Sequence, residues 1–158
     1  MKHLLFLLFI GGCLVAQSPV KETLAYSRNT IPGTPGGQNP FPASYFIYVI
    51  VKKDTPVLVT GVCLQGNWYD ATLKKVEPPV AIDHDPGVPT GEKDILVKST
   101  ADTVYQVEIQ AHKGPGDSNC AENKLAQQYP VVVYLKSGRN TWYGLVRTIS
   151  PLHPAAAM

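Results

Sequence analysis

The chain has 158 residues, with 14 Lys and Arg against 12 Asp and Glu, and its formal net charge is +2. This length suits one domain, and the near balance of charge excludes the strongly basic surface that nucleic-acid binding requires. Hydrophobic residues make up 44% of the chain, which is enough for a packed core and argues against a chain that is disordered throughout.

Residues 1–16 have the order of a secretory signal, with a positive start, an apolar run over residues 4–10 and small residues after it. The run is too short to span a bilayer, which takes about 20 residues, so no transmembrane segment is expected in the mature chain. Two processing routes remain open. Cleavage after Ala16 is favoured, but residues 10–13 resemble a lipobox, in which Cys13 would carry a lipid anchor. Both routes predict a periplasmic, cell-surface or extracellular protein.

Two cysteines, Cys63 and Cys120, follow the signal segment. Because exported proteins occupy oxidising compartments, a single structural disulfide between them is the favoured interpretation. Two inert thiols are one alternative. A reactive Cys120 is the other, because a thiol at the start of a helix has a lowered pKa.

Residues 17–43 contain five prolines and no sustained apolar period, which is typical of a semi-extended tether. Residues 44–150 are expected to form the folded domain, and residues 151–158 a C-terminal tail. Residues 77–93 contain four prolines and are expected to form a long loop.

Seven segments of the expected domain have strand patterns. Residues 45–51 form a continuous apolar run, typical of a central strand that is covered on both faces. Residues 103–111 alternate between apolar and polar side chains, so one face of their sheet should be wet and the sheet antiparallel. The other five expected strands are residues 57–64, 68–76, 94–99, 131–136 and 142–149.

Two local signals refine these strands. Val57, Val59 and Cys63 share one parity, so the Cys63 side chain is expected to point inward with the valines. Residues 65–67, Gln-Gly-Asn, predict a hairpin turn between the second and third strands.

One short helix is expected at about residues 120–128. Asn119 followed by Glu122 matches a capping box, and Pro130 ends the segment. Together these elements predict an all-β fold, an antiparallel β-sandwich of about seven strands with one short helix. In strand count this architecture resembles immunoglobulin-like modules.

The main polar motif is Asp83-His84-Asp85, in the expected long loop. Two carboxylates around an imidazole are possible ligands of a divalent cation. Pro86 and Gly87 follow at once, however, so a solvated turn is the favoured interpretation, and no metal or other cofactor is expected.

Two aromatic pairs begin expected strands, Trp68-Tyr69 and Trp142-Tyr143. Because successive side chains of a strand point to opposite faces, one ring of each pair is expected in the core and the other outside. Outward rings are candidate ligand-binding residues, since rigid aromatic area binds at small entropic cost.

The sequence contains none of the common motifs of a nucleophilic serine, a phosphate-binding loop or a zinc protease. We therefore expect an exported, non-catalytic module that contacts another envelope or extracellular protein. One alternative is a carbohydrate-binding module that uses exposed aromatics on a polysaccharide. The other is a small metal-dependent hydrolase built around Asp83, His84 and Asp85.

Overall fold

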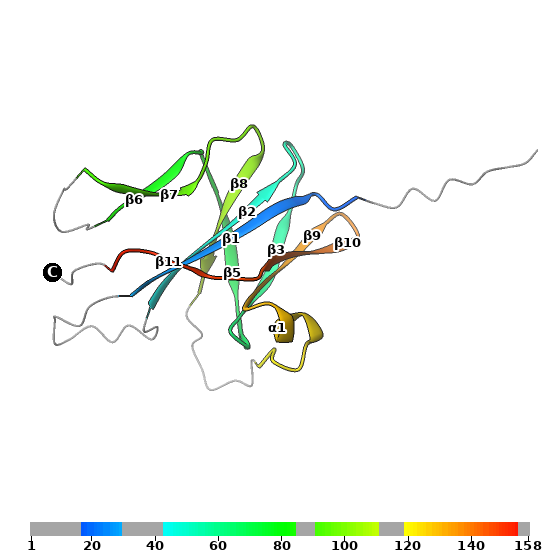
Figure 1. The fold of residues 1–158 in the computed structure, drawn as a ribbon. Helices are drawn as coiled ribbons and strands as arrows, with labels where there is room; N and C mark the ends of the chain where they lie inside the picture. Colours follow the sequence, from blue (N-terminus) through cyan, green and yellow to red (C-terminus); the bar gives the residue numbers. More distant parts are fainter. Residues whose placement is uncertain (1–16, 30–42, 85–90, 111–118, 155–158) are drawn as a thin grey trace, which may run out of the picture.

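The computed structural model describes residues 17–29, 43–84, 91–110 and 119–154. Within these residues the fold has eleven strands and one short helix (Figure 1). The strands are β1 (Val20–Asn29), β2 (Ala43–Val51), β3 (Leu58–Leu64), β4 (Asn67–Tyr69), β5 (Ala71–Val76), β6 (Val80–Asp83), β7 (Lys93–Val97), β8 (Thr103–Ile109), β9 (Val131–Ser137), β10 (Asn140–Val146) and β11 (Ser150–Pro151), and the helix is α1 (Lys124–Gln128). The predicted signal segment, with Cys13, lies outside the described residues.

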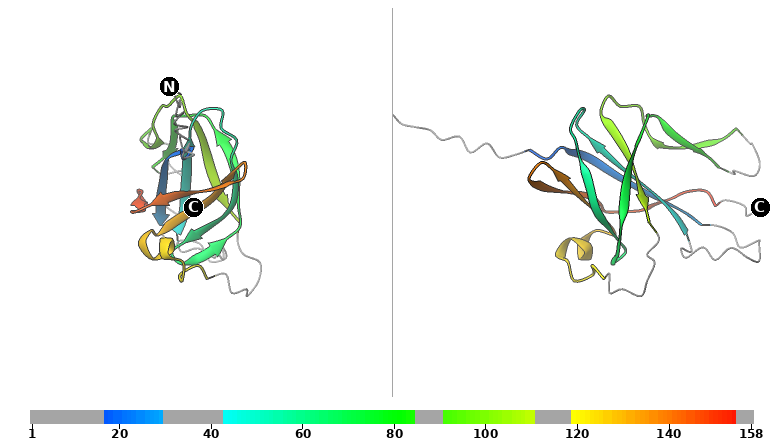
Figure 2. Two further views of the ribbon diagram at one scale, coloured as in Figure 1. Left: turned by 90° about the vertical axis from the view of Figure 1, so that its right-hand side faces the viewer. Right: turned by 180° about the vertical axis from the view of Figure 1, so that it is seen from behind.

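The strands form two facing sheets and a separate hairpin (Figure 2). The larger sheet has the order β11-β1-β2-β8-β5, the smaller has the order β10-β9-β3-β4, and β6 pairs with β7. The pairs are antiparallel except for β1 with β11. This arrangement confirms the predicted all-β antiparallel sandwich.

The main core lies between the two sheets. Ile47 and Val49 from β2 meet Val133 and Leu135 from β9, and all four side chains are buried. The opposite face of β2 is buried too, because Tyr48 packs with residues of the β6-β7 hairpin. The prediction of a central strand covered on both faces is therefore confirmed for β2, and the hairpin adds a third layer beside the larger sheet.

The tether predicted for residues 17–43 is wrong over residues 20–29. These residues form β1, which pairs with β2 from Val20 opposite Val51 to Asn29 opposite Ala43. The sandwich therefore begins at residue 20, not at 44. The prolines of the segment flank β1, and residues 30–42 lie outside the described part of the chain.

The C-terminal segment also belongs to the domain as far as it is described. Ser150 and Pro151 form β11, which pairs with β1 in parallel. The Leu152 backbone N–H donates to the Ser27 carbonyl at 2.8 Å, and its side chain packs against the core beneath the hairpin. The predicted free tail is wrong for residues 151 and 152.

The long loop predicted for residues 77–93 contains a strand. Residues 80–83 form β6, which pairs with β7, and Val80 and Ile82 pack against the larger sheet. The prolines before β6 do not interrupt its alternation, so the short strand forms directly after them. Strands β1, β6 and β11 are therefore additions to the seven that were predicted.

The strand predicted at residues 68–76 is divided between the two sheets. Its first part, β4, pairs with β3, and its second part, β5, pairs with β8. The chain passes from one sheet to the other at Asp70. The predicted hairpin turn before it is confirmed, because Gln65 and Gly66 have φ angles of 49° and 83°, the left-handed conformation of a two-residue turn.

The predicted inward direction of Cys63 is wrong. The register of β3 against β9 shifts between Val59 and Gly61, and this bulge inverts the parity of the rest of the strand. Val62 and Leu64 consequently enter the main core, whereas Cys63 lies on the other face, opposite Trp68.

Helix α1 begins later than predicted. Its N-cap is Asn123, whose side-chain oxygen accepts from the Leu125 N–H at 2.9 Å. Asn119 accepts from the Ala121 N–H at 2.7 Å and so closes a turn before the helix. The predicted helix over residues 120–128 is therefore reduced to Lys124–Gln128.

The predicted disulfide between Cys63 and Cys120 is present, with Cα atoms 6.1 Å apart. It ties the segment before α1 to β3, and the Cys120 N–H donates to the Gly66 carbonyl at 2.9 Å beside it. Within the described ranges, no helix has the length and apolar character that crossing a membrane requires.

Candidate functional site

The strongest candidate contact surface is the outward face of the smaller sheet. Trp68 of β4, Tyr134 of β9 and Tyr143 of β10 lie side by side on this face, with Leu58 of β3 nearby. The strand register places them there, because Tyr134 pairs with Tyr143 and Leu58 pairs with Lys136, two residues further along β9. We call these four residues, Leu58, Trp68, Tyr134 and Tyr143, the outer aromatic face.

The Tyr134 ring contacts both other rings of this face. The ring centroids of Trp68 and Tyr134 are 4.9 Å apart at an interplanar angle of 59°. Tyr134 and Tyr143 meet edge to face, with centroids 5.4 Å apart and an angle of 84°. Edge-to-face contacts place the positive ring edge against the negative ring face, which stabilises this arrangement.

A glycine makes room for the indole ring. Gly61 pairs with Tyr134 across β3 and β9, and a methyl group at this position would overlap the Trp68 ring. The ring therefore lies directly on the backbone of β3. Asn123 fixes the other side of the cluster by donating from its Nδ2 to the Tyr134 hydroxyl at 2.8 Å.

Partial burial has an electrostatic consequence for the central ring. Desolvation raises the pKa of the Tyr134 phenol above its ordinary value, and the neighbouring Tyr143 raises it further. Tyr134 is therefore a neutral phenol at physiological pH, and it takes part in the face as an apolar ring with a polar edge.

Part of this face is open to solvent. Leu58 is 72% exposed and Tyr143 is 42% exposed, although both are large apolar side chains. A single exposed leucine is ordinary, but here the exposed residues adjoin a packed aromatic group. The arrangement leaves an apolar surface available to a partner.

The two predicted aromatic pairs divide as expected. Trp68 and Tyr143 lie on the outward face, whereas Tyr69 and Trp142 pack against the main core. Sequence reasoning missed Tyr134, although its place between the apolar Val133 and Leu135, which share the inward parity, was a usable signal. It also missed Leu58, whose outward direction follows from the inward parity of Val57 and Val59 on either side of it.

Trp142 has a second environment. Besides packing on the core, it lines an open cleft of about 630 Å³ at the end of the sandwich where β1 begins. Lys52, Ser137 and Asn140 are among the polar residues of this cleft. An aromatic ring beside hydrogen-bonding groups is a combination that can bind a small polar ligand.

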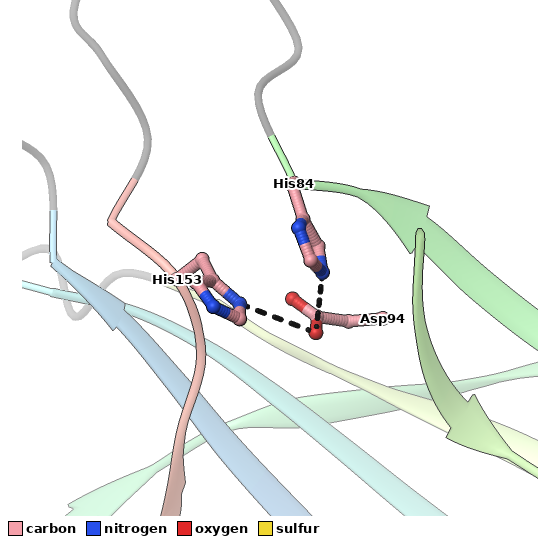
Figure 3. Close-up of side chains that lie close together, drawn as sticks. All are labelled: His84, Asp94 and His153. Carbon is pink, nitrogen blue, oxygen red and sulfur yellow. Dashed lines mark hydrogen bonds and ion pairs between the residues drawn. The ribbon is translucent and has the colours of Figure 1, made fainter. Parts of the chain in front are cut away.

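The predicted polar motif is not assembled as the sequence suggested. Asp83 directs its carboxylate to Lys93, with Oδ1 and Nζ 3.7 Å apart, and Asp85 lies outside the described residues. His84 instead faces Asp94 of β7 and His153, which follows β11 (Figure 3). A metal site built on Asp83, His84 and Asp85 is therefore not supported, because neighbouring residues of a strand end point in different directions.

Sequence spacing could not have found this second cluster. Asp94 lies on the partner strand of the hairpin and His153 is 59 positions beyond it, so only the fold brings them to His84. Arg28 of β1 approaches from the larger sheet, where its Nη2 donates to the Asp83 carbonyl at 2.8 Å. We call His84, Asp94 and His153 the His-Asp-His cluster.

Comparison of the chain with protein families, with curated proteins and with solved structures finds no match. The functional argument therefore depends on the geometry of the chain's own residues.

Proposed function

We propose that this protein is an exported, non-catalytic β-sandwich module that binds another envelope or extracellular protein through its outer aromatic face. The observation that carries the proposal is the exposure of Leu58 and Tyr143 beside the packed rings of Trp68 and Tyr134. Aromatic residues that are held rigidly lose little entropy on binding, and such residues dominate protein–protein hot spots.

The ring geometry favours a protein partner over a polysaccharide at this face. A flat sugar chain stacks best on rings that share a plane, whereas these rings stand at 59° and 84° to one another. The side chains of a protein partner can fill the gaps of such a non-planar surface, because interface cores pack as densely as protein interiors.

Two observations support export. The signal-like order of residues 1–16 directs a chain to the secretory route, and the disulfide between Cys63 and Cys120 suits an oxidising compartment. Whether the chain is then cleaved after Ala16 or lipid-anchored at Cys13 is a separate question, which the mass of the mature protein answers.

The same disulfide argues against one catalytic alternative, a reactive Cys120. Both cysteines are bonded to each other, so neither is available as a thiolate nucleophile. The outer aromatic face itself offers apolar area and the neutral phenol of Tyr134, which suit binding.

Photo-crosslinking in the cells that produce the protein tests the proposed surface. A benzophenone amino acid is placed at position 58, with position 95 as the matched control, because Leu58 and Ile95 are both exposed aliphatic residues on different layers. The expected result is a discrete protein adduct from position 58 and none from position 95. No adduct, or the same adducts from both positions, overturns the proposal, and an adduct of twice the chain's mass contradicts a heterologous partner.

The contribution of the rings is then measured on the purified partner. Tyr143→Ser is expected to weaken binding by about tenfold or more, which corresponds to about 1.4 kcal/mol. Ile95→Ser should leave the affinity unchanged. Equal affinities for the two variants and the unmodified protein would remove the outer aromatic face from the interface.

The cleft at Trp142 favours a second candidate function, which is saccharide binding. The indole ring and the polar groups of Lys52, Ser137 and Asn140 supply the stacking and hydrogen-bonding partners that a sugar needs. Affinity electrophoresis through polysaccharide gels tests it. Retardation that Trp142→Ala abolishes and Tyr143→Ala leaves intact would support this function, and unretarded migration through the gels would exclude it for the polysaccharides used.

A further inference from the structure

The His-Asp-His cluster lies on the side of the larger sheet that carries the hairpin, away from the outer aromatic face. His84 follows the end of β6, Asp94 is on β7 and His153 follows β11, so three separate segments contribute (Figure 3). One possible ligand atom from each residue lies within 4.8 Å of the other two. This cluster is separate from the surface of the proposed protein contact.

The separations of the facing atoms match those of ligands on one small cation. His84 Nε2 is 3.0 Å and His153 Nδ1 is 3.5 Å from the same oxygen, Asp94 Oδ1. Zinc holds nitrogen and oxygen ligands at about 2.0 to 2.2 Å in a tetrahedron, which places neighbouring ligand atoms about 3.3 Å apart. The two separations from Asp94 Oδ1 are therefore close to this spacing, and all three ligand atoms lie within 4.8 Å of one another.

We propose that His84, Asp94 and His153 bind one Zn²⁺ ion, with the fourth position open to water. Two imidazoles and one carboxylate are the donor set that zinc and its neighbours in the transition series prefer, whereas calcium and magnesium require mostly oxygen. The two imidazole rings stack with centroids 4.1 Å apart, and both approach the same carboxylate oxygen, Asp94 Oδ1.

The surroundings of two ligands support this assignment. The other ring nitrogen of His84, Nδ1, lies 3.3 Å from the Glu92 carboxylate. Metal-binding histidines commonly pair their second nitrogen with a carboxylate, which fixes the tautomer and raises the basicity of the ligand atom.

The second ligand whose surroundings support the assignment is Asp94. Asp94 Oδ2 is buried and makes no hydrogen bond, although a buried polar atom normally has a partner. Its neighbour is the buried guanidinium of Arg28, whose Nη2 is 3.8 Å away. Arg28 compensates the carboxylate charge from one side and leaves Oδ1 directed at the two imidazoles.

The competing account is a polar network that only holds the hairpin to the sheet. In that account His84 is needed to hydrogen-bond Asp94, but His153 is dispensable because its side chain is 65% exposed. A metal site requires both imidazoles equally. His153→Ala therefore separates the two accounts. Because the His153 side chain is exposed, the variant is expected to keep the fold, which circular dichroism checks.

The experiment uses the full mature chain, stripped with a chelator and titrated with Zn²⁺ against a chromophoric competitor. The expected result is one Zn²⁺ per chain, with affinity reduced about tenfold or more in His153→Ala and in His84→Ala. Glu92→Gln is expected to weaken binding about 10- to 100-fold, the usual effect of losing a carboxylate behind a histidine ligand. Glu108→Gln is the control, because Glu108 is an exposed carboxylate paired with Lys74 on a different part of the larger sheet, and it should bind as the unmodified protein does.

Substitution of Co²⁺ for Zn²⁺ adds a readout of geometry. Visible absorption bands typical of a four-coordinate ion should appear on titration and should be absent in His153→Ala. Less than one bound ion per chain, or equal affinity in His153→Ala and the unmodified protein, would overturn the proposal in favour of the polar network.

Discussion

The loss of folding stability on removal of the disulfide can be calculated directly from the length of the loop that the disulfide closes. The bridge joins Cys63 to Cys120 across 57 positions of the chain. A cross-link that closes a loop of this size lowers the entropy of the unfolded state, and the chain-entropy relation converts this into roughly 4 kcal/mol of stability. Domains of this size are stable by about 5 to 15 kcal/mol, so the loss would be a large share of the total.

Urea unfolding followed by tryptophan fluorescence measures this loss. The double variant Cys63→Ala with Cys120→Ala is compared with the oxidised protein and with protein that is reduced after unfolding and kept under reductant. Reduction removes the cross-link alone, whereas the double variant also removes a sulfur atom from the buried Cys63 position. Both samples are expected to lose about 4 kcal/mol, with a slightly larger loss in the variant.

One result would refute the reasoning about the unfolded chain. If both samples lost less than about 1 kcal/mol, the cross-link would not be restricting the denatured ensemble in the way that loop closure requires. Added reductant should leave the double variant unchanged, which serves as the control for effects of the reductant elsewhere.

Three further predictions concern the packing and the charge of the sandwich. Gly61→Ala forces Trp68 off the backbone of β3, so we expect a loss of about 1 to 3 kcal/mol in urea unfolding and a red shift of tryptophan emission; an unshifted spectrum would contradict the contact. Ile47→Ala leaves a cavity at a fully buried position between the sheets, so we expect the free energy of unfolding to fall by about 2 to 5 kcal/mol. An unchanged melting temperature would contradict this expectation. The hydrogen bond from Lys21 lowers the pKa of the Asp102 carboxyl, so ionised Asp102 stabilises the fold above its unfolded pKa and this contribution disappears as pH falls through the folded pKa. Asp102→Asn should therefore melt below the unmodified protein near pH 7 and together with it near pH 2, and a gap that persists in acid would refute this assignment.

Local sequence patterns predicted the strands that are buried on both faces and the strands in which buried and exposed residues alternate strictly. Residues 45–51 are apolar on both parities, and the structure covers both faces of β2. Residues 65 and 66 carry turn chemistry that does not depend on the rest of the chain, and the turn is where it was expected. In each case the local preference and the tertiary environment agree.

The errors occur where tertiary pairing decides the outcome. Residues 20–29 have few apolar side chains and become a strand because β2 offers a complete edge to pair with. The bulge between Val59 and Gly61 inverts the parity of β3, and its one local signal is the glycine in the middle of the strand pattern. The one extra residue in this bulge therefore places the Cys63 side chain on the face opposite to the predicted one.

The two candidate sites differ in how far the sequence could predict them, again because one depends on local alternation and the other on tertiary packing. The outer aromatic face was partly predictable, because alternation within a strand divides Trp68 from Tyr69 and Trp142 from Tyr143 without knowledge of the fold. The His-Asp-His cluster was not, because its three members reach one another only when the hairpin packs on the larger sheet and the chain after β11 returns beside it. His84 was the one member that sequence singled out, and its true partners lie on other strands.

The two proposed sites lie on different layers of the fold and are held in place in different ways. The outer aromatic face is built on a sheet whose strand β3 is cross-linked through Cys63 and whose central ring is held by Asn123. The His-Asp-His cluster instead joins the β6-β7 hairpin to the segment after β11, across a junction without such a covalent tie among the described residues. A bound cation there would take the place of a cross-link, since a ligand that binds only the folded state stabilises it by mass action. Zinc should therefore protect the amides of β6 and β7 from hydrogen exchange more than those of β3 and β9, and uniform protection across both sheets would contradict this division.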